Sequence, residues 1–167
     1  MDIARWFRHW FTPPMKGRRA FPPDALARIE RAIAAAELGH SGEIRFAVEA
    51  SLPWSYLRRG APARERALMV FAKLRVWDTE SNNGVLLYVE LADRSIEIVA
   101  DRGIAALVTT EQWKAISGAM REHFRAGRYE AGTVEAIAQL ADLLRAHYPL
   151  ADGARNPNEL SNRPALL

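Results

Sequence analysis

The stretch 82–103 constrains the fold of this chain more than any other. Residues 85–91 form an almost unbroken apolar run, which is typical of a β-strand covered on both faces. After a break at Asp93-Arg94, polar and apolar residues alternate through 95–101, and this pattern predicts a second, antiparallel strand with one wetter face. We therefore expect a hairpin whose first strand lies in the middle of a sheet.

The segments before the hairpin predict helices on either side of another strand. Apolar positions at helical spacing follow Pro23 and Pro62, and an alternating strand, residues 44–49, lies between these two helices. Because a helix that connects two strands of one sheet makes a right-handed crossover, strand 44–49 and the central strand are expected to be parallel. The predicted fold is a three-layer α/β/α sandwich, Rossmann-like, with a small mixed sheet of one parallel pair and one antiparallel hairpin strand.

The sequence also predicts how the remaining segments are organised. An aromatic and basic arm, residues 1–23, precedes a domain over residues 24–149. The helix after Pro62 is expected to extend to Trp77, and the sequence leaves room for one more short strand near 105–108. Residues 150–167 contain few large apolar side chains, so we expect a loosely ordered tail. A helix of the second half should begin at the capping box Thr109-x-x-Gln112.

Composition narrows the classes of function. The chain has no cysteine, which excludes disulfides, thiolate metal sites and cysteine nucleophiles. The net charge of +3 is modest, with acids and bases interspersed, so no nucleic-acid partner is expected. No apolar run approaches the roughly 20 residues of a membrane span, and charged residues interrupt the N-terminal aromatic stretch, unlike in a signal peptide. These features predict a cytoplasmic protein, peripheral to the inner face of a membrane.

The N-terminal arm combines aromatic residues with many bases and a single acid, Asp2. Four aromatic residues at i and i+4 spacing share one face of a short helix, which must end before Pro13: Trp6, Phe7, Trp10 and Phe11. Two interpretations remain open. Residues 1–21 either rest on an anionic membrane surface or a protein partner, or fold back over the sheet and bury these aromatic side chains.

The predicted topology brings three loops together at one rim of the sheet. The starts of the two parallel strands lie beside the end of the returning strand, and this rim gathers five oxygen-bearing side chains: Glu43, Asp78, Asn82, Asn83 and Asp101. Such oxygen ligands suit a hard cation, Ca²⁺ or Mg²⁺. The same residues also suit an ordinary helix-to-strand turn with solvated acids, so a metal site and a polar turn both remain open.

The opposite rim is basic. The loop after the first strand carries Arg58 and Arg59, and the hairpin turn carries Arg94. Arginines at this rim predict an anion-binding site, because the guanidinium group matches phosphate and because open α/β sheets commonly bind ligands beyond the carboxyl ends of their strands. Solvated surface charge is the other interpretation.

Motifs of the common enzyme classes are absent. The sequence contains no glycine-rich dinucleotide motif, no P-loop, no paired zinc histidines and no nucleophile elbow. The four histidines lie on separate segments, where surface or capping roles are expected. No catalytic residue is predicted.

Short motifs stand in a fixed order between about residues 24 and 149: Ser41-Gly42-Glu43-Ile44, Trp77, Asn82-Asn83-Gly84-Val85-Leu86-Leu87, Asp93-Arg94 and Gly103. They resemble the TPM domain, a module shared by a thylakoid-lumen phosphatase-like protein, a photosystem II repair factor and a modulator of levamisole receptors. Two departures are visible. Asp78 follows Trp77 where family members usually carry a glycine, and Asp101-Arg102-Gly103 stands in place of Gly-x-Gly.

The resemblance implies a small Rossmann-like sandwich and two alternative functions. The first is a non-catalytic accessory or interaction domain that acts with a protein partner, at a membrane surface. The second follows from family members described as acid phosphatases: a divalent-metal-assisted phosphatase that uses the acidic rim to hydrolyse phosphomonoesters.

Overall fold

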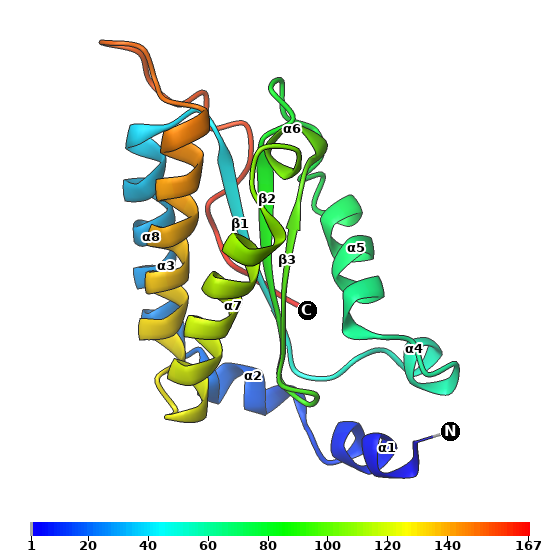
Figure 1. Ribbon diagram of the computed structural model, residues 1–167. Coiled ribbons are helices and arrows are strands. Elements are labelled where there is room, and N and C mark those ends of the chain that lie inside the picture. The colour runs from blue at the N-terminus through cyan, green and yellow to red at the C-terminus, as the bar shows by residue number, and fades with distance from the viewer. Residues whose placement is uncertain (1) are drawn as a thin grey trace.

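A four-stranded sheet in the order β3-β2-β1-β4 forms the centre of the molecule (Figure 1). The computed structural model describes residues 2–167. The strands are β1 (Glu43–Glu49), β2 (Gly84–Glu90), β3 (Ser95–Ala100) and β4 (Ala165–Leu166). β1 pairs in parallel with β2, and β2 pairs antiparallel with β3. The predicted parallel pair and hairpin strand are therefore confirmed.

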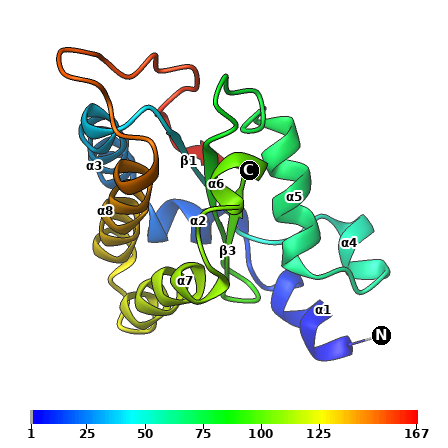
Figure 2. The same cartoon turned by 45° about the horizontal axis from the view of Figure 1, so that its top comes forward.

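Helices cover both faces of the sheet (Figure 2). The helices of one face are α3 (Pro23–Ala36), α7 (Thr110–Arg125) and α8 (Tyr129–His147), and the other face is covered by α5 (Ala63–Lys73). Strand alternation separates the two cores: Phe46 and Leu87 pack toward α8, while Ala47 and Leu86 pack toward α5. β1 and β2 are buried on both faces along their whole length. This burial explains the nearly continuous apolar run of residues 85–91 in and just after β2. The α/β/α sandwich is confirmed.

Local signals at the helix ends explain where α7 starts and α5 stops. Thr109 and Gln112 form the predicted capping box of α7. The end of α5 corrects the prediction that the helix reaches Trp77. Arg75 adopts a left-handed φ of 56°, and the Val76 amide donates to the Phe71 carbonyl at 3.0 Å, an arrangement that ends α5 early. Val76 is consequently buried, and Trp77 is half exposed.

Two short helices occupy segments where the sequence did not predict them. No strand forms near 105–108: residues 102–105 form helix α6 (Arg102–Ala105), and a turn follows it. Asp101 caps this helix, and its carboxylate accepts the Arg102 amide at 2.7 Å. Helix α4 (Trp54–Arg58) forms in the loop after β1, and a 3₁₀ turn, η1 (Glu37–Gly39), follows α3.

The C-terminal tail is held against the sheet, which corrects the expectation of a loosely ordered segment. Its strand β4 pairs in parallel with β1. The Asn156 side-chain amide donates to the carbonyls of His40 at 2.8 Å and Gly42 at 3.0 Å, and Leu160 packs against the α5 core. Most of these contacts are hydrogen bonds, so the apolar content of the tail did not reveal them.

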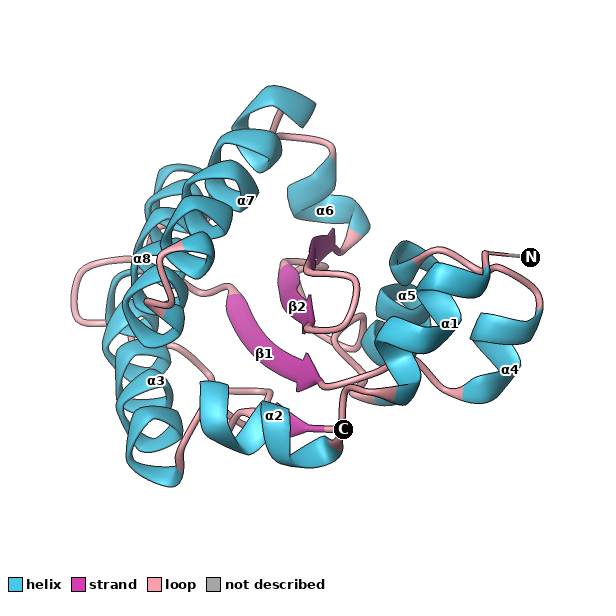
Figure 3. Cartoon of the chain, turned by 90° about the horizontal axis from the view of Figure 1, so that it is seen from below, coloured by secondary structure: helices cyan, strands magenta, loops and turns pink. Residues whose placement is uncertain are grey.

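The N-terminal arm forms two short helices at the end of the sheet where β1 and β2 finish. These are α1 (Ile3–Trp10) and α2 (Pro14–Ala20), and α1 lies beside α4 (Figure 3). As predicted, α1 ends before Pro13. Within residues 2–167, no helix has the length and apolar character needed to cross a membrane.

Candidate functional site

The first candidate site is the motif rim, which we define as residues 41–43, 78–84 and 101–103, where β1 and β2 begin. The three loops predicted to meet here do meet. The Asn83 side-chain amide donates to the Ser41 carbonyl at 3.2 Å, and the Asp101 amide donates to the Gly84 carbonyl at 2.8 Å. Gly103 is required at this point, because a Cβ there would lie 2.5 Å from the Asn82 carbonyl oxygen.

Three of the five predicted metal ligands are already engaged by protein groups. Glu43 is buried, and its two carboxylate oxygens accept the backbone amides of Glu159 at 3.0 Å and Leu160 at 3.2 Å. Asn82 accepts a hydrogen bond from the Arg102 guanidinium at 3.0 Å. Asp78 forms an exposed ion pair with Arg75. These three side chains therefore hold the tail, α6 and the end of α5 in place.

The other two predicted ligands offer oxygens with no protein partner. Asn83 and Asp101 flank Gly84 in the structure, and both are buried. The Asn83 Oδ1 and Asp101 Oδ2 atoms are both shielded from solvent and accept no hydrogen bond from any of residues 2–167. Buried oxygens of this kind are normally satisfied by a hydrogen-bond donor, a water molecule or a cation. These two atoms carry what remains of the predicted metal site.

A buried group of charges lies next to the motif rim, beneath the tail. Glu37, Glu43 and Arg45 are all nearly inaccessible, although none of them forms a direct ion pair with any of residues 2–167. Burial raises the pKa of Glu37 to about 7 and also raises the pKa of Glu43. Burial lowers the pKa of Arg45, while both glutamates act against that change. The stability of this region should therefore depend on pH.

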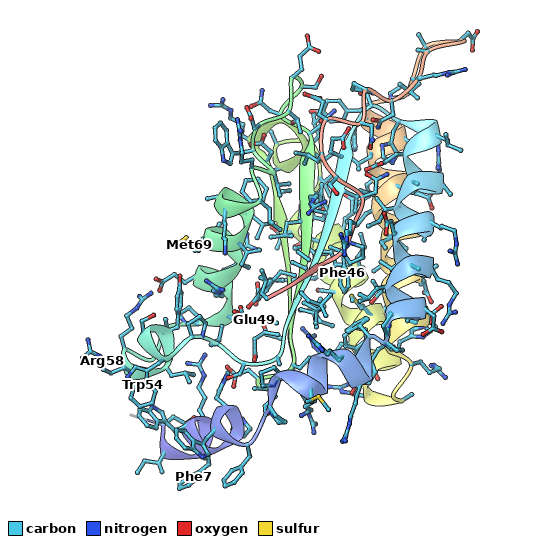
Figure 4. All side chains as sticks on the ribbon, turned by 180° about the vertical axis from the view of Figure 1, so that it is seen from behind. Phe7, Phe46, Glu49, Trp54, Arg58 and Met69 are labelled. Carbon is cyan, nitrogen blue, oxygen red and sulfur yellow. The ribbon has the colours of Figure 1, made fainter. Side chains whose placement is uncertain are left out.

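The predicted anion site at the opposite rim does not form as one cluster. Arg59 lies over the Tyr56 ring at 4.7 Å and pairs with Glu65, and Arg58 extends outward from α4 (Figure 4). Arg94 instead lines a pocket together with residues of α2 and α7. All three arginines follow the carboxyl ends of strands, but Arg58 and Arg59 lie at α4 while Arg94 lies in the β2–β3 turn and faces α2 and α7.

The arm is attached to this opposite rim by polar contacts. His9 of α1 is buried; its Nδ1 accepts the Leu52 amide at 3.1 Å, and its Nε2 lies 3.1 Å from Asp93 Oδ2. Arg5 and Arg8 pair with the same Asp93 carboxylate at 2.7 and 3.1 Å. Burial lowers the pKa of His9, which agrees with an unprotonated Nδ1. We call His9, Arg5, Arg8 and Asp93 the latch.

The latch is not a convincing metal site, although the ligand atoms of His9, Glu90 and Asp93 lie within 4.8 Å of one another. Asp93 already binds two guanidinium groups. The Glu90 carboxylate accepts the amides of Ala92 at 2.9 Å and Asp93 at 2.7 Å. Nearby positive charge repels a cation, which disfavours a metal at this position. His9 and Asp93 instead anchor the arm, and Glu90 holds the hairpin turn.

The aromatic side of α1 faces solvent, so the interpretation in which the arm folds back over the sheet and buries its four aromatic side chains is wrong. Only Trp6 is partly covered, by an edge contact with Trp54 at 3.8 Å between ring centroids. Trp10 is 77% exposed, Phe11 is 73% exposed, and Phe7 points away from the body of the molecule (Figure 4). The arm is therefore docked, but through its polar face.

Comparison with known proteins identifies the domain. A family model described as the TPM domain matches residues 17–143. The chain belongs to the TPM domain family. The fold resembles the NMR structure of the BA42 protein from the psychrophilic bacterium Bizionia argentinensis, with a TM-score of 0.75 and 28% sequence identity. That similarity covers 86% of this chain and 93% of BA42. Among curated proteins, none matches the chain significantly.

The family model does not match the two ends of this TPM domain. Residues 17–143 contain β1, β2 and β3 with their covering helices, whereas α1 and β4 lie outside the matched range. His9, the central residue of the latch, is therefore outside it too, while Asp93 is inside. The exposed aromatic face of α1 therefore lies outside the range that the family model matches.

Sequence reasoning missed His9 and the latch of this TPM domain. The histidines were assigned to surface or capping roles, but His9 and His40 are buried. A signal was present: Arg5 and His9 are four residues apart and share the face of α1 opposite the aromatic side chains.

Proposed function

We propose that this TPM domain is a non-catalytic module that binds an anionic membrane surface through the outward face of α1 and α2. The observation that carries the proposal is the orientation of α1, whose polar side is fixed to the domain while its aromatic side faces solvent. A soluble domain rarely exposes several large apolar side chains together unless that surface binds something.

The composition of this face favours a lipid bilayer. Its exposed apolar side chains are Ile3, Phe7, Trp10, Phe11 and Met15. The exposed basic side chains of α2 are Lys16, Arg18 and Arg19, and within residues 2–167 none of them forms an ion pair. Helices that lie in the membrane interface combine aromatic side chains with lysine and arginine in this way, and each base near an anionic surface contributes about 1 kcal/mol to binding.

The latch helps membrane binding by ordering the helix in advance. An isolated helix as short as α1 is marginal in water, because nucleation is unfavourable. The contacts of His9 and Arg5 with Asp93 hold α1 in place before it meets a surface. Because the helix is already ordered before binding, the unfavourable free energy of ordering it does not weaken the affinity for the membrane.

Vesicle cosedimentation tests the proposal. Vesicles of phosphatidylcholine with phosphatidylglycerol should bind the protein, and pure phosphatidylcholine vesicles should bind it much less. The double variant Trp10→Ser/Phe11→Ser should reduce binding at least about tenfold, because large apolar side chains each contribute roughly 1.5–3 kcal/mol on burial. Its melting temperature should not fall, since both side chains are exposed.

A matched control uses exposed apolar side chains outside α1 and α2. The double variant Leu38→Ser/Trp77→Ser removes two such side chains, which are 80% and 50% exposed. It should bind vesicles like the unaltered protein. Equal binding by all three proteins, or no binding to anionic vesicles, would reject the membrane proposal in favour of a protein partner for this face.

A second candidate function, a divalent-metal-assisted phosphatase, is favoured by the unpartnered Asn83 Oδ1 and Asp101 Oδ2 atoms. Hard oxygen ligands of this kind fit Ca²⁺ or Mg²⁺, which would neutralise phosphate charge and activate water when bound. Millimolar Ca²⁺ or Mg²⁺ should then raise the melting temperature, and less so in Asp101→Asn. Absence of any shift, together with no metal-dependent hydrolysis of a generic phosphomonoester, would reject this candidate.

A further inference from the structure

A second feature of the same end of the molecule is a pocket between α2, the β2–β3 hairpin and the C-terminal part of α7. All three elements lie at the lower end of the molecule in Figure 1, the end that also carries α1. The pocket encloses about 480 Å³, within the range of roughly 300–1,000 Å³ that is typical of small-molecule sites. It is distinct from the latch and from the motif rim.

The mouth of the pocket is basic. Lys16 of α2, Arg94 of the hairpin turn, and Arg121 and Arg125 of α7 contribute to its lining. Arg125 pairs with Glu122 on its own helix. Within residues 2–167, the side chains of Lys16, Arg94 and Arg121 form no ion pair or hydrogen bond. Three bases from three different elements therefore converge with their charge available to a ligand.

The acidic groups around the pocket do little to offset this charge. Glu90 lines the pocket, but it is buried, and both of its carboxylate oxygens accept backbone amides. Burial raises its pKa to about 7, so its negative charge is reduced near neutral pH. Asp93 is held by Arg5 and Arg8 in the latch. The end of α7 and the start of α8 meet here with opposing dipoles, so the side chains set the sign of the potential.

The inner wall of the pocket is apolar. Of its lining residues, Leu91 and Ile96 are buried and Phe124 and Tyr129 are half-buried, whereas the basic residues of the pocket are exposed. A ligand that fits both parts carries an anionic phosphate and an adjoining apolar or glycerol portion. Arginine binds phosphate through paired N–H groups, which makes the basic mouth suited to a phosphate oxygen.

We infer that this pocket binds the phosphate headgroup of an anionic lipid at the membrane surface. The inference rests on the proposed membrane function, because the pocket opens at the end of the molecule that carries the aromatic face of α1. α1 and α2 would then provide insertion and general charge attraction, and the pocket would select one lipid molecule by its headgroup.

The backbone at Arg94 adds a second observation. Arg94 adopts a left-handed φ of 54°, which is unfavourable for a residue with a side chain and which glycine or asparagine adopts more readily. Arg94 is the last residue of the hairpin turn, and its side chain contributes to the pocket lining.

The test separates the pocket from the membrane surface by using a soluble headgroup. Glycerol 3-phosphate is titrated into the full-length protein and followed by backbone NMR shifts, and the same proteins are then tested on vesicles containing phosphatidylglycerol. The variant Arg94→Gln/Arg121→Gln removes two pocket bases. Its matched control, Arg31→Gln/Lys73→Gln, removes two exposed bases of α3 and α5.

We expect glycerol 3-phosphate to shift the amides of the hairpin turn and of α7. The pocket variant should weaken that binding about tenfold or more, because paired guanidinium contacts to phosphate are lost, and it should also weaken vesicle binding. The control variant should keep the soluble affinity unchanged. Trp10→Ser/Phe11→Ser should lose vesicle binding but still bind glycerol 3-phosphate, so failure of the membrane proposal is distinguishable from failure of the pocket.

Three results would overturn the inference. The first is an equal loss of glycerol 3-phosphate affinity in the pocket and control variants, which would show that the ligand is attracted only by the overall charge of the protein. The second is a lack of shifts in the hairpin and α7 with glycerol 3-phosphate. The third is binding of inorganic phosphate as tight as that of glycerol 3-phosphate, with vesicle binding unaffected in the pocket variant, which would assign the pocket to free phosphate.

Discussion

His9 Nε2 of α1 lies 3.1 Å from Asp93 Oδ2 of the β2–β3 hairpin, so the first helix is fixed to the middle of the chain. The variant His9→Ala removes this contact and also the acceptor for the Leu52 amide. We expect the free energy of unfolding to fall by about 1–3 kcal/mol, the cost of leaving a buried donor without a partner. Urea unfolding measures it. The exposed Arg18→Ala serves as the control, and equal stability of both variants would show that the latch is not formed.

A second prediction uses the raised pKa of Glu37, which burial shifts from its ordinary 4.5 to about 7. A carboxyl group with a raised folded-state pKa binds more protons when folded, so its contribution is fully present below pH 4.5 and is lost as pH rises through 7. The variant Glu37→Gln keeps an oxygen for the Ile44 amide but cannot ionise. Compared with the unaltered protein, it should gain about 2 kcal/mol of stability at pH 8 relative to pH 5.

Urea unfolding of both proteins at the two pH values gives this difference directly. His40 has the opposite linkage, because burial lowers its pKa from 6.5 to about 4 and its contribution is lost on acidification through that range. It is present in both proteins and cancels in the comparison. Glu30→Gln, an exposed position on α3, is the control. A pH dependence that is the same in Glu37→Gln as in the unaltered protein contradicts the prediction.

The fold was predictable from the sequence because its strongest signals are local. The buried run of β2, the alternation in β3 and the capping box of α7 are each determined by neighbouring residues. Strand β4 was not predictable in this way. It has only two residues and depends on pairing with β1, far away in the sequence.

The candidate sites were less predictable, for a related physical reason. Topology brought the rim loops together as expected, but it could not show that Glu43 is used by tail amides or that Asn82 binds Arg102. In the N-terminal arm, the spacing of the aromatic residues predicted that they share one face of a helix. The direction of that face depends on the contact between His9 and Asp93, which are far apart in the sequence. Long-range polar contacts of this kind leave no periodic signal.

A third prediction concerns the tail, which the Glu43 carboxylate holds through the amides of Glu159 and Leu160. Because both carboxylate oxygens are used, Glu43→Ala should release these amides and weaken the pairing of β4 with β1. Hydrogen exchange of residues 159–167 should accelerate by at least about tenfold, which corresponds to roughly 1.4 kcal/mol of local stability. Exchange in α8 should change little.

Asp78→Ala is the matched control for the tail prediction, because Asp78 lies on the same rim but pairs only with Arg75 at the surface. Exchange of residues 159–167 in this variant should equal that of the unaltered protein. If Glu43→Ala also leaves the exchange of these amides unchanged, the tail is held by β4 and Asn156 alone.

The last prediction concerns a buried charge pair between the sheet and α5. Glu49 of β1, which is labelled in Figure 4, lies on the side of the sheet that faces α5. It pairs with Arg66 through two hydrogen bonds of 2.7 and 2.8 Å, and the Tyr88 hydroxyl donates to the same carboxylate at 2.7 Å. Burial and the nearby Glu49 raise the pKa of Tyr88, and the bonds to Glu49 raise the pKa of Arg66. The hydroxyl and guanidinium therefore stay protonated as donors.

Removing Arg66 alone should lower the free energy of unfolding more than removing the Tyr88 hydroxyl, and more than removing all three polar groups together. Arg66→Ala leaves a carboxylate that is almost fully buried, which should lower the free energy of unfolding by about 3–5 kcal/mol. Tyr88→Phe loses one hydrogen bond and should cost about 1–2 kcal/mol. The triple variant Glu49→Leu/Arg66→Met/Tyr88→Phe removes every polar group together, so it should be more stable than Arg66→Ala. Urea unfolding gives the order, with the exposed Arg31→Ala as control; a triple variant less stable than Arg66→Ala would show that the ion pair itself, and not the stranded charge, determines the cost.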